Sequence, residues 1–333
     1  MAVTEGSLFL ETVHMIHVLA APAKLPLILF ASRPSATTTA FRRSVTANRM
    51  PLPYVDEILT NAIPRPVPMP VPTGSAVPMT PTKLSVIEQS KRLAAYTAVD
   101  QHILPHHKVI GIGSGSTVPY VVERIVQQGE QLNKDRVFIP TGFQSKELIV
   151  VSKLSLGDVD QFPTIDVTVD GADEVDSELN CIKGGGACHL REKVLAEAAE
   201  TFVLVADYRK NVQYLGTNFP GVPIEVVPFA YAKVLQNLHH RLGSPNATLR
   251  MAKAKAGPVV SDNGNFIIDA PFPVEAMRDP YKLMARIKLL TGVVEVGLFC
   301  HMAQAAYFGN QDGSVTVKSR LEGEVIEETL PSA

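Results

Sequence analysis

The chain has 333 residues, of which 46% are apolar and 19% are charged, and its formal net charge is −2. This length is enough for two domains with a sizeable core, and the composition is ordinary for a globular protein. The charge balance offers no basic surface, so no nucleic-acid partner is expected. The cysteines Cys181, Cys188 and Cys300 form no CxxC pair and indicate free thiols in a reducing compartment.

Residues 1–82 differ in character from the rest of the chain. The apolar stretch Val13–Ala31 is interrupted by histidine, lysine and proline, which argues against a membrane span. Basic residues occur without any acid over Thr12–Val55, as in an organelle transit peptide, and prolines recur over Pro51–Pro81. We therefore expect a disordered extension with a proline-rich linker, and organelle targeting is the alternative to a cytoplasmic location.

From residue 83 onward, short apolar runs alternate with helical patterns. This alternation implies parallel strands joined by right-handed crossovers, and continuous apolar runs are typical of strands covered on both faces. The predicted class is α/β, with a Rossmann-like doubly wound parallel sheet. The expected helices are 83–103, 118–128, 144–151 and 192–199, and the expected strands are 108–113, 136–139, 165–169 and 202–206.

The pattern changes after Pro220, where a second, smaller domain is predicted. Its β-α-β-β-α-β order suggests a partly antiparallel, ferredoxin-like α+β domain. We expect the catalytic domain to comprise 83–219 and 300–328, and the small domain 220–299. The expected elements of the small domain are a strand at 224–227, a helix at 231–242, a hairpin at 258–268 that turns at Asp262-Asn263-Gly264, a helix at 280–290 and a strand at 293–299.

Three polar loops follow predicted strands, where ligands bind in doubly wound sheets. The first is GIGSGST, which leads into a helix and contains Ser114, Gly115, Ser116 and Thr117. Backbone N–H groups at a helix N-terminus, together with hydroxyls, make an anion site. The motif is neither a Walker A loop nor GxGxxG, so a simple phosphate is favoured over a nucleotide. The alternative is a tight turn in which a hydroxyl caps the helix.

The second loop, DGADEVD, is rich in carboxylates. Its spacing does not match a calcium-binding EF-hand, and no metal is expected. Asp170 and Asp173 lie nearest the strand and are the candidates for bonding a ligand's hydroxyl groups. Glu174 and Asp176 are expected to be surface charges or capping groups.

The third loop, IKGGGACHLREK, combines Lys183 with three glycines and Glu192. Glycines let the backbone approach a ligand closely, Lys183 can hold a negative charge, and Glu192 can move a proton. The flanking Arg191 and Lys193 are expected to keep Glu192 ionised, with Lys193 otherwise serving solubility. An ordinary solvated loop is the alternative reading of this segment.

Weaker signals complete the set. Lys210, in ADYRKN after a predicted strand, could reach a phosphate or carboxylate. The histidines, including His189, have no partners at metal-ligand spacing and are expected to be structural or exposed. Cys188 is expected to be a packing residue.

The ordered motifs GIGSGST, IPTGFQS, DGADEVD, IKGGGACHLREK, VADYRK and VVEVGLF resemble the A-type ribose-5-phosphate isomerases, particularly fungal members. The resemblance covers about residues 83–326. It implies interconversion of D-ribose 5-phosphate and D-ribulose 5-phosphate without cofactor or metal, in a homodimer or homotetramer. It implies a sugar-phosphate ligand and neither nucleic acid nor membrane as partner.

The resemblance also implies roles for individual residues. Glu192 would be the proton-transferring base of a cis-enediolate mechanism, Lys183 its oxyanion partner, and Asp170 a group that exchanges protons with hydroxyls. The substrate-binding residues implied are Lys91, Ser114, Gly115, Ser116, Thr117, Asp170, Gly171, Ala172, Asp173, Lys183, Gly184, Gly185, Gly186 and Lys210. For Lys91 the register is open, because Arg92 stands beside it. A deaminase or lactonase acting on phosphorylated sugars, or a non-catalytic sugar-phosphate sensor, are the alternatives.

Overall fold

The fold is taken from a computed structural model of the chain, which describes residues 84–219 and 221–331. The predicted extension lies outside these residues, and so does the alternative prediction of a targeting signal. Within the described ranges, no helix is both long and apolar enough to cross a bilayer.

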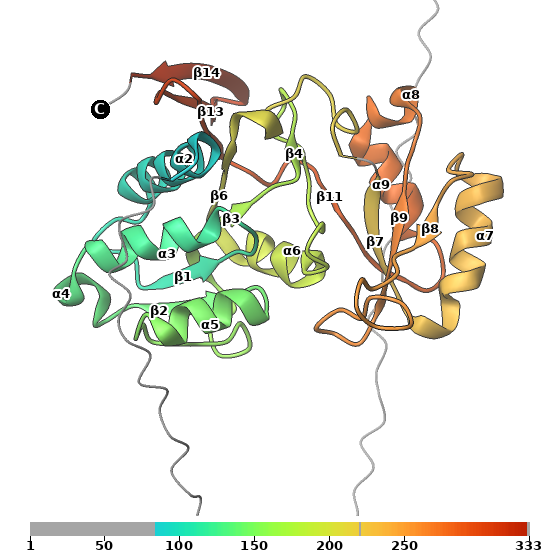
Figure 1. Cartoon of the computed structure of the whole chain (residues 1–333), viewed down its shortest axis with the longest axis horizontal. Helices are drawn as coiled ribbons and strands as arrows, with labels where there is room; N and C mark the ends of the chain where they lie inside the picture. Colours follow the sequence, from blue (N-terminus) through green and yellow to red (C-terminus); the bar gives the residue numbers. More distant parts are fainter. Residues whose placement is uncertain (1–83, 220, 332–333) are drawn as a thin grey trace, which may run out of the picture. The chain divides into compact units, whose positions relative to one another are not determined.

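The largest sheet has seven strands in the order β14-β13-β12-β6-β3-β1-β2 (Figure 1). Pairing is parallel from β12 to β2, which confirms the mostly parallel sheet predicted for an α/β fold. The edge pairs β12–β13 and β13–β14 are antiparallel and were not predicted. The strands are β1 (Val109–Ile112), β2 (Val137–Pro140), β3 (Ile165–Gly171), β6 (Ala199–Asp207), β12 (Ala305–Gly309), β13 (Val315–Leu321) and β14 (Glu324–Leu330).

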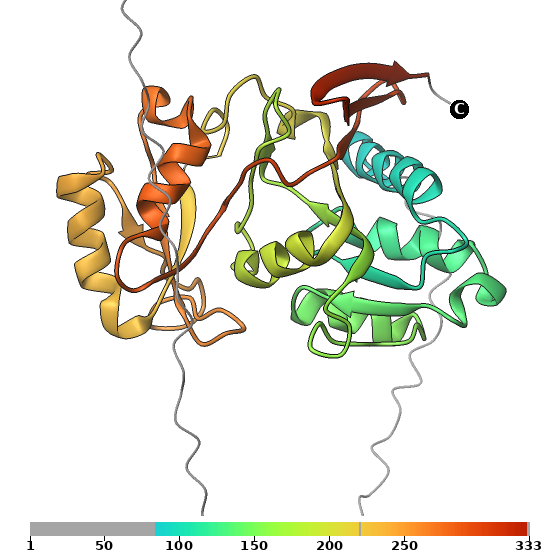
Figure 2. The same cartoon turned by 180° about the vertical axis from the view of Figure 1, so that it is seen from behind.

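Helices cover both faces of this sheet. Alternate residues of β6 show why its apolar run is continuous: Val203 and Val205 pack with the helices α2 and α3, whereas Phe202 and Leu204 belong to a core on the opposite face with α6. Figures 1 and 2 both show β13 and β14, in dark red, beside α2, in cyan. The helices of this part are α2 (Val86–His102), α3 (Val118–Gln127), α4 (Glu130–Asn133), α5 (Phe143–Val151) and α6 (His189–Ala198).

Helix α2 illustrates how sequence sets these boundaries. Ser85 precedes it and accepts a hydrogen bond from the N–H of Glu88 at 3.3 Å, which satisfies one of the free donors of the first turn. The helix buries small side chains, including Ala94 and Ala98, against the sheet. A Cβ on Gly309 of β12 would lie 1.8 Å from the carbonyl oxygen of Ser90, so the strand needs glycine where α2 crosses it.

The chain after Pro220 forms a four-stranded sheet with its own hydrophobic core. Its order is β10-β7-β9-β8 and all of its pairs are antiparallel, whereas the sequence predicted partial antiparallel pairing. The expected hairpin at 258–268 turns where predicted, since the N–H of Ser261 donates to Asn265 at 2.8 Å. It is short, with one bridge between Val260 and Phe266, because β9 otherwise pairs with β7 and β8. The elements are β7 (Val222–Val226), α7 (Tyr231–Arg241), β8 (Thr248–Leu249), β9 (Phe266–Ala270), α8 (Val274–Met277), α9 (Pro280–Lys288) and β10 (Val293–Val296).

A three-stranded sheet, not foreseen from the sequence, links these parts of the chain. It consists of β4 (Glu174–Val175), β5 (Cys181–Ile182) and β11 (Leu298–Phe299) in the order β11-β5-β4. The segment after β11 then enters the seven-stranded sheet as β12, which pairs with β6.

Candidate active site

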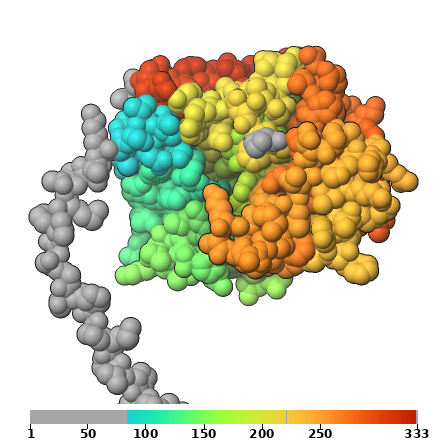
Figure 3. Space-filling model, turned by 45° about the vertical axis from the view of Figure 1, so that its right-hand side comes forward, coloured from blue at the N-terminus to red at the C-terminus, as the bar shows by residue number. Residues whose placement is uncertain are grey.

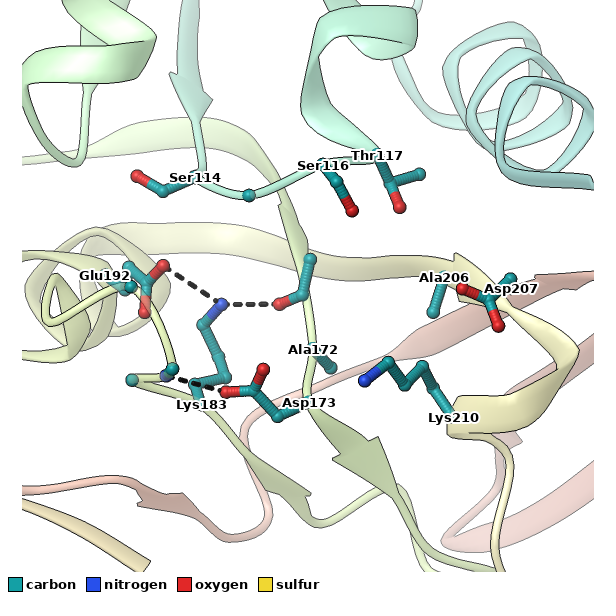
Figure 4. Close-up of a pocket in the computed structure, with 15 residues that line it drawn as sticks. Ser114, Ser116, Thr117, Ala172, Asp173, Lys183, Glu192, Ala206, Asp207 and Lys210 are labelled. Carbon is teal, nitrogen blue, oxygen red and sulfur yellow. Dashed lines mark hydrogen bonds and ion pairs between the residues drawn. The ribbon is translucent and has the colours of Figure 1, made fainter. Parts of the chain in front are cut away.

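A pocket lies at the carboxyl ends of the neighbouring parallel strands β1, β3 and β6, where a doubly wound sheet binds its ligands. The three predicted loops contribute to it, together with the segment after β6. Figure 4 shows the pocket. It is lined by Ser114, Gly115, Ser116, Thr117, Gly171, Ala172, Asp173, Lys183, Gly184, Gly185, Gly186, Glu192, Ala206, Asp207 and Lys210.

The loop after β1 is held in place by Asp170 of β3. The Asp170 carboxylate accepts hydrogen bonds from the N–H groups of Ser114, at 2.9 Å, and Gly171, at 2.7 Å. A Cβ on Gly113 would lie 2.0 Å from this carboxylate, so only glycine allows the loop to pass so close. The Ser114 hydroxyl is also occupied, because it shares a 2.6 Å hydrogen bond with Thr141.

Thr117 stands at the N-cap of α3, yet its side chain makes no capping hydrogen bond. The Thr117 hydroxyl therefore does not cap α3, which was the alternative considered for this loop. Figure 4 shows Ser116 and Thr117 directed into the pocket at the start of α3. Two hydroxyls and a helix N-terminus together form a suitable site for an anion.

The glycine turn between Lys183 and α6 forms another wall. Gly184 has φ of +107°, and a Cβ there would lie 2.7 Å from Nδ1 of His189. The N–H of Gly185 donates to Asp173 at 2.8 Å, which fixes the turn against the loop after β3. The segment is thus a built element of the site rather than a solvated loop.

Lys183 is the centre of a buried charge cluster. Its Nζ lies 3.4 Å from Glu192 and 2.5 Å from the carbonyl oxygen of Gly171 (Figure 4). It also lies 3.0 Å from Asp170. All three charged residues are buried, but Asp170 does not line the pocket. It lies behind Lys183, so the expectation that it bonds a ligand's hydroxyls does not match its position. One oxygen of Glu192, Oε2, has no hydrogen-bond partner among the described residues.

Burial and the nearby charge of Asp170 raise the pKa of Glu192 to about 8. Burial alone would lower the pKa of Lys183, but the charges of Asp170 and Glu192 outweigh it and raise this pKa. Lys183 therefore keeps its positive charge, and Glu192 can exchange its proton near neutral pH. Burial also raises the pKa of Asp170.

Arg191 and Lys193 do not act on Glu192 as the sequence suggested. Arg191 points to the small sheet and donates to Asn263 at 2.9 Å, and Lys193 forms an ion pair of 2.9 Å with Glu295. Lys193 is largely buried and does not serve solubility. Successive residues of a helix point in different directions, so sequence neighbours of Glu192 need not be its electrostatic neighbours.

The carboxylates of the second loop are also more deeply placed than expected. Glu174 is fully buried and accepts from the N–H groups of residues 216–219, including Gly216 at 2.6 Å and Phe219 at 2.8 Å. Asp176 is buried and accepts from the N–H of Asn180 at 2.8 Å. Neither is a surface charge. In the described part of the chain, no three His, Cys, Asp or Glu side chains could hold a metal ion.

Lys210 ends the 3₁₀ turn Tyr208–Lys210 after β6, and its ammonium group points into the pocket from the side opposite Glu192 (Figure 4). Asp207 beside it also lines the pocket. Asp207 was not identified from the sequence, because a single acid at the end of a strand forms no recognisable motif. Lys91 does not line the pocket. It pairs with Glu88 at 2.7 Å, and its role in phosphate binding stays a prediction.

His189 and Cys188 lie at the start of α6 but do not line the pocket. Burial lowers the pKa of His189 to about 3, so this ring is neutral. Burial likewise raises the pKa of Cys188 to about 11, which keeps its thiol protonated. Both observations fit the structural roles expected for these residues.

Three similarities to known proteins fit this fold and site. The family model for ribose 5-phosphate isomerase A (phosphoriboisomerase A) matches residues 137–313. A ribose-5-phosphate isomerase of Cryptococcus neoformans is 63% identical over 87% of this chain and 93% of its own. One of Mycosarcoma maydis is 70% identical over 71% of this chain and 82% of its own.

Among solved structures, a D-ribose-5-phosphate isomerase in complex with phospho-erythronic acid superposes with a TM-score of 0.62. It is 36% identical, and the match covers 73% of this chain and 98% of that one. The doubly wound sheet and its strand-end pocket define an α/β enzyme. The chain belongs to the ribose-5-phosphate isomerase A family and is an isomerase, as its motifs predicted.

Proposed function

We propose that this protein interconverts D-ribose 5-phosphate and D-ribulose 5-phosphate in the non-oxidative pentose phosphate pathway, with Glu192 as the proton-transfer base. The observation that carries the proposal is the placement of Glu192 and Lys210 on opposite sides of one pocket (Figure 4). The two sides suit the two ends of a sugar phosphate. Membership of the family, whose relatives bear this enzyme name, supports the substrate.

The phosphate end is formed by Ser116, Thr117 and Lys210. The hydroxyls and the N-terminus of α3 supply hydrogen-bond donors and a partial positive charge, and Lys210 supplies a full charge. The relative in complex with phospho-erythronic acid supports a phosphorylated sugar derivative as the ligand class.

The reacting end is formed by Glu192, Lys183 and Asp173. The Glu192 carboxylate takes the proton from C2 of the open-chain aldose, and the electron pair of that C–H bond forms the C1–C2 double bond of a cis-enediolate. The negative charge develops on O1, where Lys183 stabilises it. Glu192 then returns the proton to C1 while the hydroxyl proton of O2 passes to O1, which leaves the C2 ketone.

Asp170 acts through Lys183 in this mechanism. Because Asp170 is fully buried behind the ammonium group, it fixes the direction of Lys183 rather than contacting the sugar. Asp173, which lines the pocket, orients the substrate's hydroxyl groups. The mechanism needs no group beyond these side chains, so no cofactor or metal enters the proposal.

The direct test adds ribose 5-phosphate to the protein in the presence of chelator and follows ketose formation. We expect rapid, reversible conversion that the chelator does not change. Absence of ketose, or a reaction that needs added metal, would contradict the proposal. Hydrolysis or ammonia release would favour a lactonase or deaminase, and binding without turnover would favour a sensor.

We further propose that the four-stranded sheet with α7 and α9 is a separate ferredoxin-like domain, at about 220–299. Its strand order and antiparallel pairing support that class. We propose a homodimer or homotetramer, and a cytoplasmic location that suits the free thiols of the described residues.

A further inference from the structure

We propose that Arg250 is a positioning residue for catalysis, which clamps the glycine turn between Lys183 and Glu192 from the small sheet. Arg250 directly follows β8, outside every motif that carries the family resemblance. The inference rests on the proposed function for its kinetic part, and on contacts alone for its structural part.

Arg250 binds the backbone carbonyl groups of the glycine turn. Its Nη1 donates to the carbonyl oxygens of Gly184, at 2.9 Å, and Gly185, at 3.1 Å. The opposite side of the turn is held by Asp173, which accepts from the N–H of Gly185. Three glycines in succession have little conformational preference of their own, so contacts from outside must select one conformation.

Arg250 is itself fixed in place. Its guanidinium forms a two-pronged ion pair with Asp269 of β9, through Nε at 2.8 Å and Nη2 at 2.5 Å. The backbone is anchored as well, because the N–H of Arg250 donates to Ile267 at 2.8 Å and its carbonyl accepts from Val259 at 2.8 Å. Because both its backbone and its guanidinium are hydrogen-bonded to the small sheet, Arg250 can hold the flexible turn at a fixed position relative to that sheet.

The turn that Arg250 holds connects Lys183 to the helix that carries Glu192, so its position should affect the rate of the reaction. Lys183 directly precedes Gly184, and Glu192 lies in the first turn of α6, which directly follows the turn. Any displacement of the glycines therefore changes the distance between the base and its cationic partner, now 3.4 Å. Loss of the clamp should mainly lower kcat, because those two groups act on the reacting carbons, while the phosphate end is untouched.

A second contact supports the same connection. The loop at Asp262, next to the small sheet, accepts from the N–H of Phe143 at 3.0 Å, and Asn263 accepts from Arg191 of α6 at 2.9 Å. Figure 3 shows this orange segment lying against the green part of the chain that contains α5. The loop before β9 thus contacts α5 as well as α6, the helix that carries Glu192.

The test compares Arg250→Ala and Arg250→Lys with Arg124→Ala. Arg124 forms a similar two-pronged pair with Asp100, at 2.8 and 2.9 Å, away from the pocket. We expect Arg250→Ala to lower kcat by about 10- to 100-fold with little change in KM. Lysine should not restore kcat, because it lacks the planar fork by which Arg250 donates to Asp269 through Nε and Nη2 while Nη1 reaches both carbonyl oxygens. The control should retain wild-type kcat.

Hydrogen–deuterium exchange over residues 183–188 tests the clamp without substrate. Exchange should quicken in Arg250→Ala and not in Arg124→Ala. A wild-type kcat in Arg250→Ala would overturn the positioning role, and unchanged exchange would overturn the clamp. If Arg250→Ala does not fold, Asp269→Asn takes its place with the same criteria. If the wild-type protein does not isomerise ribose 5-phosphate, the proposed function fails and exchange alone decides the clamp.

Discussion

Glu192 is a buried acid whose environment sets the pH at which it can accept a proton. Its pKa is about 8, because burial and Asp170 disfavour the charged form more than Lys183 favours it. A general base must be ionised in the free enzyme, so we expect kcat/KM to rise with pH and level off above about pH 8. A pH–rate profile measures this, and constant kcat/KM between about pH 6 and 9 would contradict it.

The cause of this shift can be tested separately. Asp170 is the largest charge acting to raise the pKa of Glu192. Replacing Asp170 with asparagine removes that charge, so the midpoint of the kcat/KM profile should move to lower pH. A midpoint that stays in place or moves upward would show that Asp170 does not set it.

The same pKa makes folding stability depend on pH. The unfolded carboxyl releases its proton near its ordinary value of 4.5, whereas the native one keeps it until about 8. Stability from this group is therefore complete below about 4.5 and is lost as pH rises to about 8. Glutamine does not titrate, so Glu192→Gln should not lose stability in this way. The free energy of unfolding of Glu192→Gln minus that of the wild type should therefore increase between pH 5 and 9, by an amount on the order of several kcal/mol.

Urea unfolding of both proteins at several pH values measures this difference. Glu197→Gln is the matched control, since Glu197 is an exposed glutamate of the same helix. A constant difference between wild type and Glu192→Gln across the range would mean that Glu192 does not titrate in that window.

Among the helices and strands, the sequence predicted those features that depend only on one strand and the loop directly after it. The ends of β1, β3 and β6 could be predicted because continuous apolar runs mark buried parallel strands, whose carboxyl ends meet at one edge. Partners from distant segments could not be predicted. Lys193 meets Glu295, and Glu174 meets residues 216–219, through folding that no local pattern encodes. The two-residue strands β4, β5 and β11 are too short for any periodicity.

Glu174 gives a stability prediction at this scale. Its carboxylate accepts from four consecutive N–H groups of the 216–219 loop. In Glu174→Gln one oxygen becomes a donor that faces other donors, so the free energy of unfolding should fall by about 1–3 kcal/mol. The control is Glu178→Gln, whose glutamate is exposed in the same segment. Equal urea midpoints for the two variants would contradict this account of Glu174.

At the scale of the whole molecule, the lining residues of the pocket in the described part of the chain all lie between Ser114 and Lys210. The solved relative in complex with phospho-erythronic acid is matched over 98% of its length by 73% of this chain. Deletion of residues 1–82 should therefore leave kcat and KM unchanged. Steady-state kinetics of the shortened protein test this, and a large loss of kcat would assign the extension a catalytic part.

The proposed reaction depends on Glu192, which combines a buried carboxylate, an oxygen without a partner in the described residues and a raised pKa. The most direct measurement is the turnover of Glu192→Gln, with ribose 5-phosphate binding measured by calorimetry on the same protein. We expect kcat to fall by about 10²–10⁴-fold or more while binding of the sugar phosphate is retained. Near-normal turnover by Glu192→Gln would contradict the proposed reaction.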